Sequence, residues 1–265
     1  MRIHGYVRAL WVACLVGAGC ATVEHTPPHN AARPITLRVG DRIPADAYVY
    51  DSDRRKHRIT DLIDPHATVV VLEILAGAAV PGTISDRGGL WCEDTYNDMP
   101  LANFVYRRYA ERPAVQFIPV VVPPVYHGAY GYDRAAFMAT PEGDDRFERA
   151  FARFIAATEP LLRGPGRAGV IAYPRVYYDP KNRLLLNLTR TDLAPSAAYG
   201  RRYGWEGCFK WPGDSQTYGT PTMWLLGGDG TVLRRPFFGN VYEGPPQHLR
   251  YTIRDVVKAI DAHLR

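Results

Sequence analysis

The stretch WCEDT at residues 91–95 lies between a predicted strand and a predicted helix, and this order determines the fold. Upstream, the run TVVVLEIL at residues 68–75 is dense in β-branched side chains and predicts a buried central strand. Downstream, apolar side chains recur at helical spacing and predict a helix over 93–112. Cys92 is therefore expected just before a helix, where backbone N–H groups and the helix dipole stabilise a thiolate.

The C-terminal half continues to alternate strand and helix patterns. A second buried strand is predicted at 115–124 (VQFIPVVVPP), and an amphipathic helix at 143–163. A strand pair about the turn DPKN is expected over 174–188, and a β-hairpin turning at GGDG over 222–238. An amphipathic helix is predicted over 246–264. The pattern indicates an α/β domain whose central mixed sheet is flanked by helices.

The N-terminus has the layout of a secretory signal. Arg2 and Arg8 precede an uncharged apolar run at 9–18, which is too short to span a bilayer because a spanning helix needs about 20 apolar residues. The run ends in Gly-Ala-Gly before Cys20, and this ending resembles the bacterial lipoprotein signal. The resemblance implies that residues 1–19 are removed and that Cys20 carries lipid. An ordinary secretory signal with a spare cysteine is the alternative.

The rest of the chain divides into a tether and one domain. Residues 20–37 are polar and contain prolines, as expected of a flexible tether between a membrane and a domain. Residues 38–265 form the predicted domain. The resemblance to lipoproteins implies a place in the cell envelope, facing the periplasm or the outside. Ala21 stands where an Asp retains many such proteins at the inner membrane, so the outer membrane is favoured in a cell that has two.

Composition narrows the classes of function. The formal charge is +5 and the short basic runs are scattered, which favours a solvated surface over a nucleic-acid interface. The 8 histidines show no metal-ligand spacing and no glycine-rich stretch matches a phosphate loop, so neither a metal nor a dissociable cofactor is predicted. Of the 4 cysteines, Cys14 is expected to leave with the signal, and the resemblance to lipoproteins implies that Cys20 carries lipid. Cys92 and Cys208 remain, either as a disulfide or as one reactive and one buried thiol.

Five features of the domain resemble the thioredoxin superfamily. They are the lead-in VGDRIPADAYVYDSD from Val39, EILA at 73–76, Trp91-Cys92 with Thr95 in place of a second motif cysteine, Pro100 where the active-site helix is kinked, and GTPT at 219–222 in the manner of the cis-proline loop. The resemblance covers residues 38–264 and implies a thioredoxin-like fold. A large insertion over about 125–218 then precedes the cis-proline strand and supplies an extra helix and an aromatic, lid-like segment.

The resemblance also implies roles at the site. The expected catalytic residues are Cys92, Thr95, Cys208 and Glu73, and the expected substrate contacts are Trp91, Thr220 and Pro221. Cys92 is expected to attack a substrate disulfide, while Thr95 donates its hydroxyl hydrogen to the Cys92 thiolate. Cys208 is expected to act as the resolving thiol, which attacks the mixed disulfide at Cys92. Glu73 is expected to be a buried proton acceptor. The carboxylates of Glu93 and Asp94 oppose activation, because negative charge near the sulfur disfavours the thiolate.

The implied function is thiol–disulfide exchange at the outer face of a membrane, with protein thiols or disulfides, or a small thiol, as partners. Two alternatives stay open. A thiol peroxidase would react with a hydroperoxide to form a sulfenic acid at Cys92, although the Pro and the Thr or Ser that peroxiredoxins place closely upstream are not met. A redox-inactive binding module would use the Tyr- and Trp-rich inserted segment as its recognition surface.

Overall fold

The computed structural model describes most of the predicted domain. It covers residues 35–80, 88–123, 136–137, 140–163, 173–181, 184, 209–210, 220–238 and 251–265. The predicted signal, Cys20, which is predicted to carry lipid, and Cys208, which is predicted to act as the resolving thiol, lie outside these ranges. Across the described ranges, no helix has both the length and the apolar character that crossing a membrane requires.

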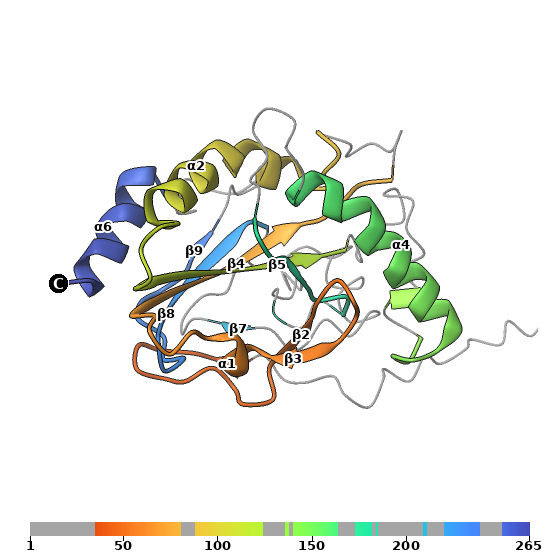
Figure 1. Cartoon of the computed structure of the whole chain (residues 1–265), viewed down its shortest axis with the longest axis horizontal. Helices are drawn as coiled ribbons and strands as arrows, with labels where there is room; N and C mark the ends of the chain where they lie inside the picture. The colour runs from red at the N-terminus through yellow and green to blue at the C-terminus, as the bar shows by residue number, and fades with distance from the viewer. Residues whose placement is uncertain are drawn as a thin grey trace, which may run out of the picture.

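A mixed sheet forms the centre of the domain, and seven of its strands lie in the described residues (Figure 1). Its middle strands are β4 (Val69–Ala76) and β5 (Val115–Val122), which run parallel and in register along their whole length. Both confirm the strands predicted from their β-branched runs. Every residue of β4 is buried, as expected for a strand covered on both faces.

Shorter strands extend the sheet in both directions. Beyond β5 lie β6 (Tyr177–Tyr178), β2 (Tyr48–Tyr50) and β3 (Lys56–Arg58), and beyond β4 lie β8 (Thr222–Gly227) and β9 (Phe237–Phe238). β8 pairs antiparallel with both β4 and β9, which confirms the hairpin predicted at GGDG. A separate parallel pair joins β1 (Ile35–Thr36) to β7 (Phe209–Lys210).

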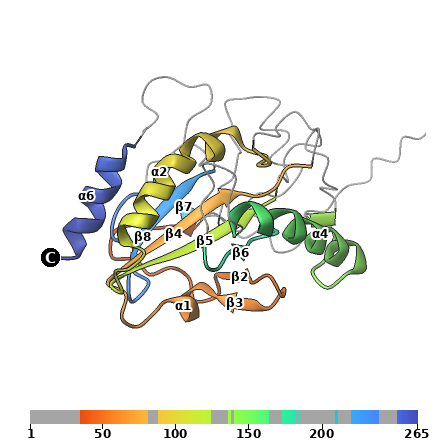
Figure 2. The same cartoon turned by 45° about the horizontal axis from the view of Figure 1, so that its top comes forward.

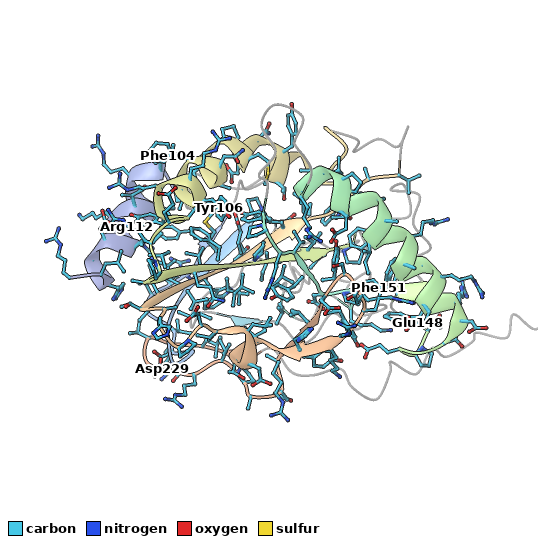
Figure 3. The ribbon with its side chains drawn as sticks, in the orientation of Figure 1. Phe104, Tyr106, Arg112, Glu148, Phe151 and Asp229 are labelled. Carbon is cyan, nitrogen blue, oxygen red and sulfur yellow. The ribbon has the colours of Figure 1, made fainter. Side chains whose placement is uncertain are left out.

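In the described part of the chain, three helices cover one face of this sheet (Figures 1 and 2). They are α2 (Glu93–Tyr109), α4 (Asp145–Leu162) and α6 (Ile253–His263). Met99 of α2, Phe154 of α4 and Val256 of α6 belong to one buried apolar cluster, together with Val71 and Leu75 of β4. Figure 3 shows Tyr106 on the sheet side of α2, whereas Phe104, which is 48% exposed, lies on its outer side.

The other face of the sheet carries a second buried cluster. Leu72 and Ile74 of β4 point into it, because side chains alternate along a strand. Trp91, Trp224 and Ile59 of the short helix α1 (Ile59–Leu62) complete this layer. Parallel β4–α2–β5, followed by antiparallel β8 after a cis-proline, gives the thioredoxin-like fold that the sequence predicts.

The segment expected to be an insertion, about 125–218, contributes in part to the core. Its helix α4 buries Phe147, Phe151 and Phe154 against the sheet, and its strand β6 pairs with both β5 and β2. Helix α4 is the extra helix that this segment was expected to supply. Strand β6 lies within the range 174–188, where the sequence predicts a strand pair.

Two predicted elements lie partly outside the described residues. Of the strand pair predicted about DPKN over 174–188, the structure describes 174–181 and 184, which contain β6; there the Asp179 N–H bonds to Val121 O and the Asp179 carboxylate accepts the Leu184 N–H. Of the last helix, predicted from 246, residues 246–250 lie outside the described ranges, and α6 begins after Thr252. Thr252 and Asp255 form a reciprocal capping box there, which satisfies the first backbone N–H groups and fixes the start.

Candidate active site

Cys92 lies at the start of α2, as predicted. It is the N-cap residue, with extended backbone angles of φ −116° and ψ 118°, and its carbonyl accepts the Tyr96 N–H at 3.1 Å. The side chain is half-buried, and Sγ donates a hydrogen bond to the backbone oxygen of Thr220 at 3.3 Å. The thiol therefore lies between the positive end of a helix and a carbonyl from a segment 128 residues away.

Thr220 and Pro221 form the wall opposite the helix. Their peptide bond is cis, as predicted, and both side chains are buried. They enter β8, which pairs with β4 so that Ile74 faces Thr222. The Thr220 Oγ1 atom is buried and has no hydrogen-bond partner among the described residues. This pairing brings the cis-proline loop to the same edge of the sheet as Cys92.

Trp91 supports the thiol from inside the core. Its indole N–H donates to Val122 O at 2.7 Å, and the side chain is only 1% exposed. Among the three predicted substrate contacts, Trp91 is thus placed within the apolar layer, while Thr220 lies against the thiol. A role for Trp91 in holding the Cys92 backbone fits its position better than direct contact with a substrate.

Four consecutive backbone N–H groups at the end of β4 bond to four different segments. The Ala76 N–H is accepted by Thr95 Oγ1 of α2 at 3.2 Å, and the Gly77 N–H by Val122 O at 3.2 Å. The next two, from Ala78 and Ala79, are accepted by Thr158 Oγ1 of α4 at 3.1 Å and by Gly89 O at 2.7 Å. Buried N–H groups need partners, so these bonds tie the edge of the site together.

Thr95 stands at the position of the missing second cysteine and is fully buried. Its oxygen accepts the Ala76 N–H, which holds the first turn of α2 against the end of β4. A hydroxyl that accepts one hydrogen bond keeps its own hydrogen for another. Donation of a hydrogen bond from Thr95 to the Cys92 thiolate stays a prediction. The bond that Thr95 Oγ1 accepts from Ala76 gives the hydroxyl a structural role as well.

Glu73 is buried beneath α2, with 1% of its surface exposed. Tyr173 donates a hydrogen bond to its Oε2 atom, while Oε1 has no partner among the described residues. Burial raises the pKa of Glu73 to about 7; the Tyr173 hydrogen bond opposes this rise, and the nearby Asp98 carboxylate adds to it. The carboxyl group is therefore able to bind and release a proton near neutral pH, as the predicted acceptor role requires.

A second tyrosine connects this carboxyl layer to the C-terminal segment. Tyr251 donates to Asp98 Oδ2 at 3.2 Å, and the Tyr106 and Tyr173 rings meet edge to face with centroids 5.1 Å apart. Burial raises the pKa of both Tyr173 and Tyr251 well above that of a free tyrosine, so these hydroxyls stay protonated donors. The layer under α2 thus holds two carboxyl groups with a tyrosine on each.

The environment of Cys92 pulls its thiol in opposite directions. The start of α2 favours the thiolate, because helix N-terminal N–H groups attract negative charge. The Thr220 carbonyl favours the protonated thiol, since it accepts the S–H hydrogen. The site can therefore carry nucleophilic sulfur chemistry.

Two site residues had no signal in the sequence. Tyr173 and Thr158 come from the segment expected to be an insertion, and each contacts a residue 80 or 100 positions away. In the described part of the chain, no group of three or more His, Cys, Asp or Glu side chains is arranged to hold a metal ion.

Comparisons with known proteins return structural resemblances alone. No protein-family model matches the chain. No curated protein sequence matches it either. Among solved structures, a protein from Chlorobium tepidum described as a candidate thiol:disulfide interchange protein DsbE is 18% identical with a TM-score of 0.39, over 87% of this chain and 100% of that one.

Two further solved structures resemble the chain at a similar level. The thioredoxin domain of a thiol-disulfide oxidoreductase from Bacteroides vulgatus is 10% identical with a TM-score of 0.35, over 87% of this chain and 100% of that one. A thiol peroxidase from Chromobacterium violaceum is 12% identical with a TM-score of 0.38, over 88% and 92%. What this chain does is therefore inferred from its own residues.

Proposed function

We propose that this chain is a membrane-anchored, extracytoplasmic thiol–disulfide oxidoreductase that works through Cys92. The observation that carries the proposal is the 3.3 Å hydrogen bond from Cys92 Sγ to Thr220 O. It places a half-buried thiol between the start of α2 and the backbone of a cis-proline loop. That backbone offers hydrogen bonds to an extended peptide whose sulfur reaches Cys92.

In the proposed step, the Cys92 thiolate attacks one sulfur of a substrate disulfide. A mixed disulfide forms, and the other substrate sulfur leaves as a thiolate that takes up a proton. A second thiol, for which Cys208 is the candidate, then attacks Cys92 Sγ. The substrate is reduced to two thiols while two protein thiols are oxidised to one disulfide. Glu73, with its pKa near 7, accepts and returns the proton.

Anchoring through Cys20 belongs to the same proposal and is supported by the signal-like N-terminus. A lipid-bearing cysteine followed by a polar tether would hold the domain at the surface of the cell envelope, within reach of exported proteins. Labelled fatty acid should be incorporated into the full chain in bacteria and be lost in Cys20→Ala. Incorporation that persists in Cys20→Ala would rule out this anchor.

The exchange step is tested by trapping its intermediate. The reduced full chain is mixed with a disulfide-bonded model peptide, quenched with acid and analysed by mass spectrometry. Cys208→Ser should accumulate a mixed disulfide at Cys92, and the matched variant Cys92→Ser should form none. Absence of the adduct from both the wild type and Cys208→Ser would overturn the proposal. Rapid consumption of hydroperoxide through Cys92 would then indicate a peroxidase. A protein that neither forms the mixed disulfide nor consumes hydroperoxide would be a binding module.

A further inference from the structure

The C-terminal half of α4 contacts the backbone segment that leads into Cys92. Thr158 Oγ1 accepts the Ala78 N–H at 3.1 Å, and the Thr158 side chain is fully buried. Leu161, one turn further along α4, packs on Gly89 so closely that a Cβ built there would lie 2.8 Å from Leu161 Cδ2. Figure 1 shows this end of α4 beside the N-terminal end of α2.

The contacted segment consists of two short arms bonded to each other. Ala78 and Leu90 form an antiparallel bridge, flanked by hydrogen bonds from Ala79 N to Gly89 O at 2.7 Å and from Trp91 N to Gly77 O at 3.1 Å. The first arm continues β4, and the second ends at the residue before Cys92. Any shift of the first arm is therefore passed to the second and to the thiol.

We propose that Thr158 is a positioning residue for Cys92. It fixes the position of this two-arm bridge so that Cys92 Sγ reaches Thr220 O. Thr158 accepts the Ala78 N–H, and helix α4 holds Thr158 in a fixed position. The inference rests on the proposed role of Cys92 as the reactive atom. It adds that a residue 66 positions after Cys92, from the segment expected to be an insertion, sets the reactivity of that thiol.

The chemistry of the hydroxyl explains why threonine is needed here. Valine has the same shape but no acceptor, so it would leave the Ala78 N–H buried without a partner. The bridge must then shift until that N–H finds water or another acceptor, and the shift draws Cys92 away from Thr220 O. Serine keeps the oxygen and should keep the bridge in place.

The test compares the alkylation of Cys92 in the full chain across pH 6 to 11, under reducing conditions and with each cysteine resolved by peptide mass spectrometry. Thr158→Val should raise the alkylation rate about fivefold at pH values below the plateau, because Cys92 loses the S–H hydrogen bond to Thr220 O that favours the unreactive protonated thiol. Thr158→Ser should stay within about twofold of wild type. Ile155→Val, which trims the same buried face of α4, is the control for general loosening.

The outcomes separate the inference from the proposed function. Wild-type alkylation in a folded Thr158→Val protein, or an equal rise in Ile155→Val, would overturn the positioning role. Because alkylation reads the thiol without any substrate, this result does not depend on the mixed-disulfide assay. Failure of that assay would overturn the exchange reaction and leave the response of Cys92 to Thr158 measurable. Circular dichroism at each pH confirms that every variant is folded.

Discussion

The Tyr173 hydroxyl donates a hydrogen bond to Glu73 Oε2 inside the layer between β4 and α2. This is the one hydrogen bond that the carboxyl group makes among the described residues, and the second oxygen is buried without a partner. A carboxylate in such surroundings has lost water on both oxygens and regained a donor on one. Burial therefore favours the neutral acid, although the hydrogen bond from Tyr173 opposes this effect, and the stability of the fold depends on pH.

Between about pH 4.5 and pH 7, Glu73 should make the protein less stable as the pH rises. Its pKa is about 7 in the folded protein against 4.5 for a free side chain, so within this window the folded chain binds more protons than the unfolded chain. The resulting loss of unfolding free energy is about 3 kcal/mol across the window. Glu73→Gln, which keeps an acceptor for Tyr173 and carries no charge, should remove this slope in urea denaturation curves. Parallel pH profiles of the two proteins would contradict the assignment.

Removal of the Tyr173 hydroxyl should raise the pKa of Glu73 further, because the hydrogen bond from Tyr173 lowers it. Tyr173→Phe should cost about 1–3 kcal/mol at pH 8, where the carboxylate is ionised and would lose its donor, and less at pH 5. Tyr106→Phe removes a hydroxyl from the neighbouring ring and serves as the matched control, with an expected change within about 0.5 kcal/mol. An equal loss at both pH values for Tyr173→Phe would show that packing, rather than the hydrogen bond, decides its effect.

Thr95→Val should destabilise the protein by about 1–3 kcal/mol, because it leaves the Ala76 N–H buried without an acceptor. Thr95→Ser retains the oxygen and should lose less than about 1 kcal/mol. Urea denaturation of the two variants measures the difference. If both substitutions cost the same, the methyl group and not the hydroxyl matters at the position of the missing second cysteine.

The frame of the site could be predicted from the sequence because it rests on local patterns. The run TVVVLEIL predicts a buried β4 and so the burial of Glu73, and the helical spacing after Cys92 predicts that the thiol begins α2. The Thr220–Pro221 loop follows from its motif. Each of these signals occupies fewer than about 20 consecutive residues, which is the reach of periodicity and motif arguments.

The partners within the site could not be predicted, because tertiary packing selects them. Tyr173 meets Glu73 only after β6 has paired with β5, and Thr158 meets Ala78 only after the crossover through α4 has packed on the sheet. Nothing in the residues around Tyr173 or Thr158 differs from an ordinary buried segment.

Gly77→Ala should disturb the site through α4. A Cβ at this position would lie 2.2 Å from Phe154 Cζ and 2.7 Å from Val121 Cγ1, too close for any side chain to accept unmoved. The Phe154 ring cannot easily yield, since it packs edge to face on Phe137 and Tyr178 with centroids 6.1 Å apart in each pair. The expected cost of overpacking is about 1–3 kcal/mol in unfolding free energy.

Shortening Phe154 provides the matched test of this contact. Phe154→Leu alone leaves a cavity and should destabilise the protein, but combined with Gly77→Ala it makes room for the new methyl group. The double variant should therefore be more stable than the sum of the two single losses, by about 0.5–3 kcal/mol. Urea denaturation of the wild type, the two single variants and the double variant completes this double-mutant cycle. Strict additivity would mean that the two side chains do not meet, and that the base on which α4 holds the Cys92 segment lies elsewhere.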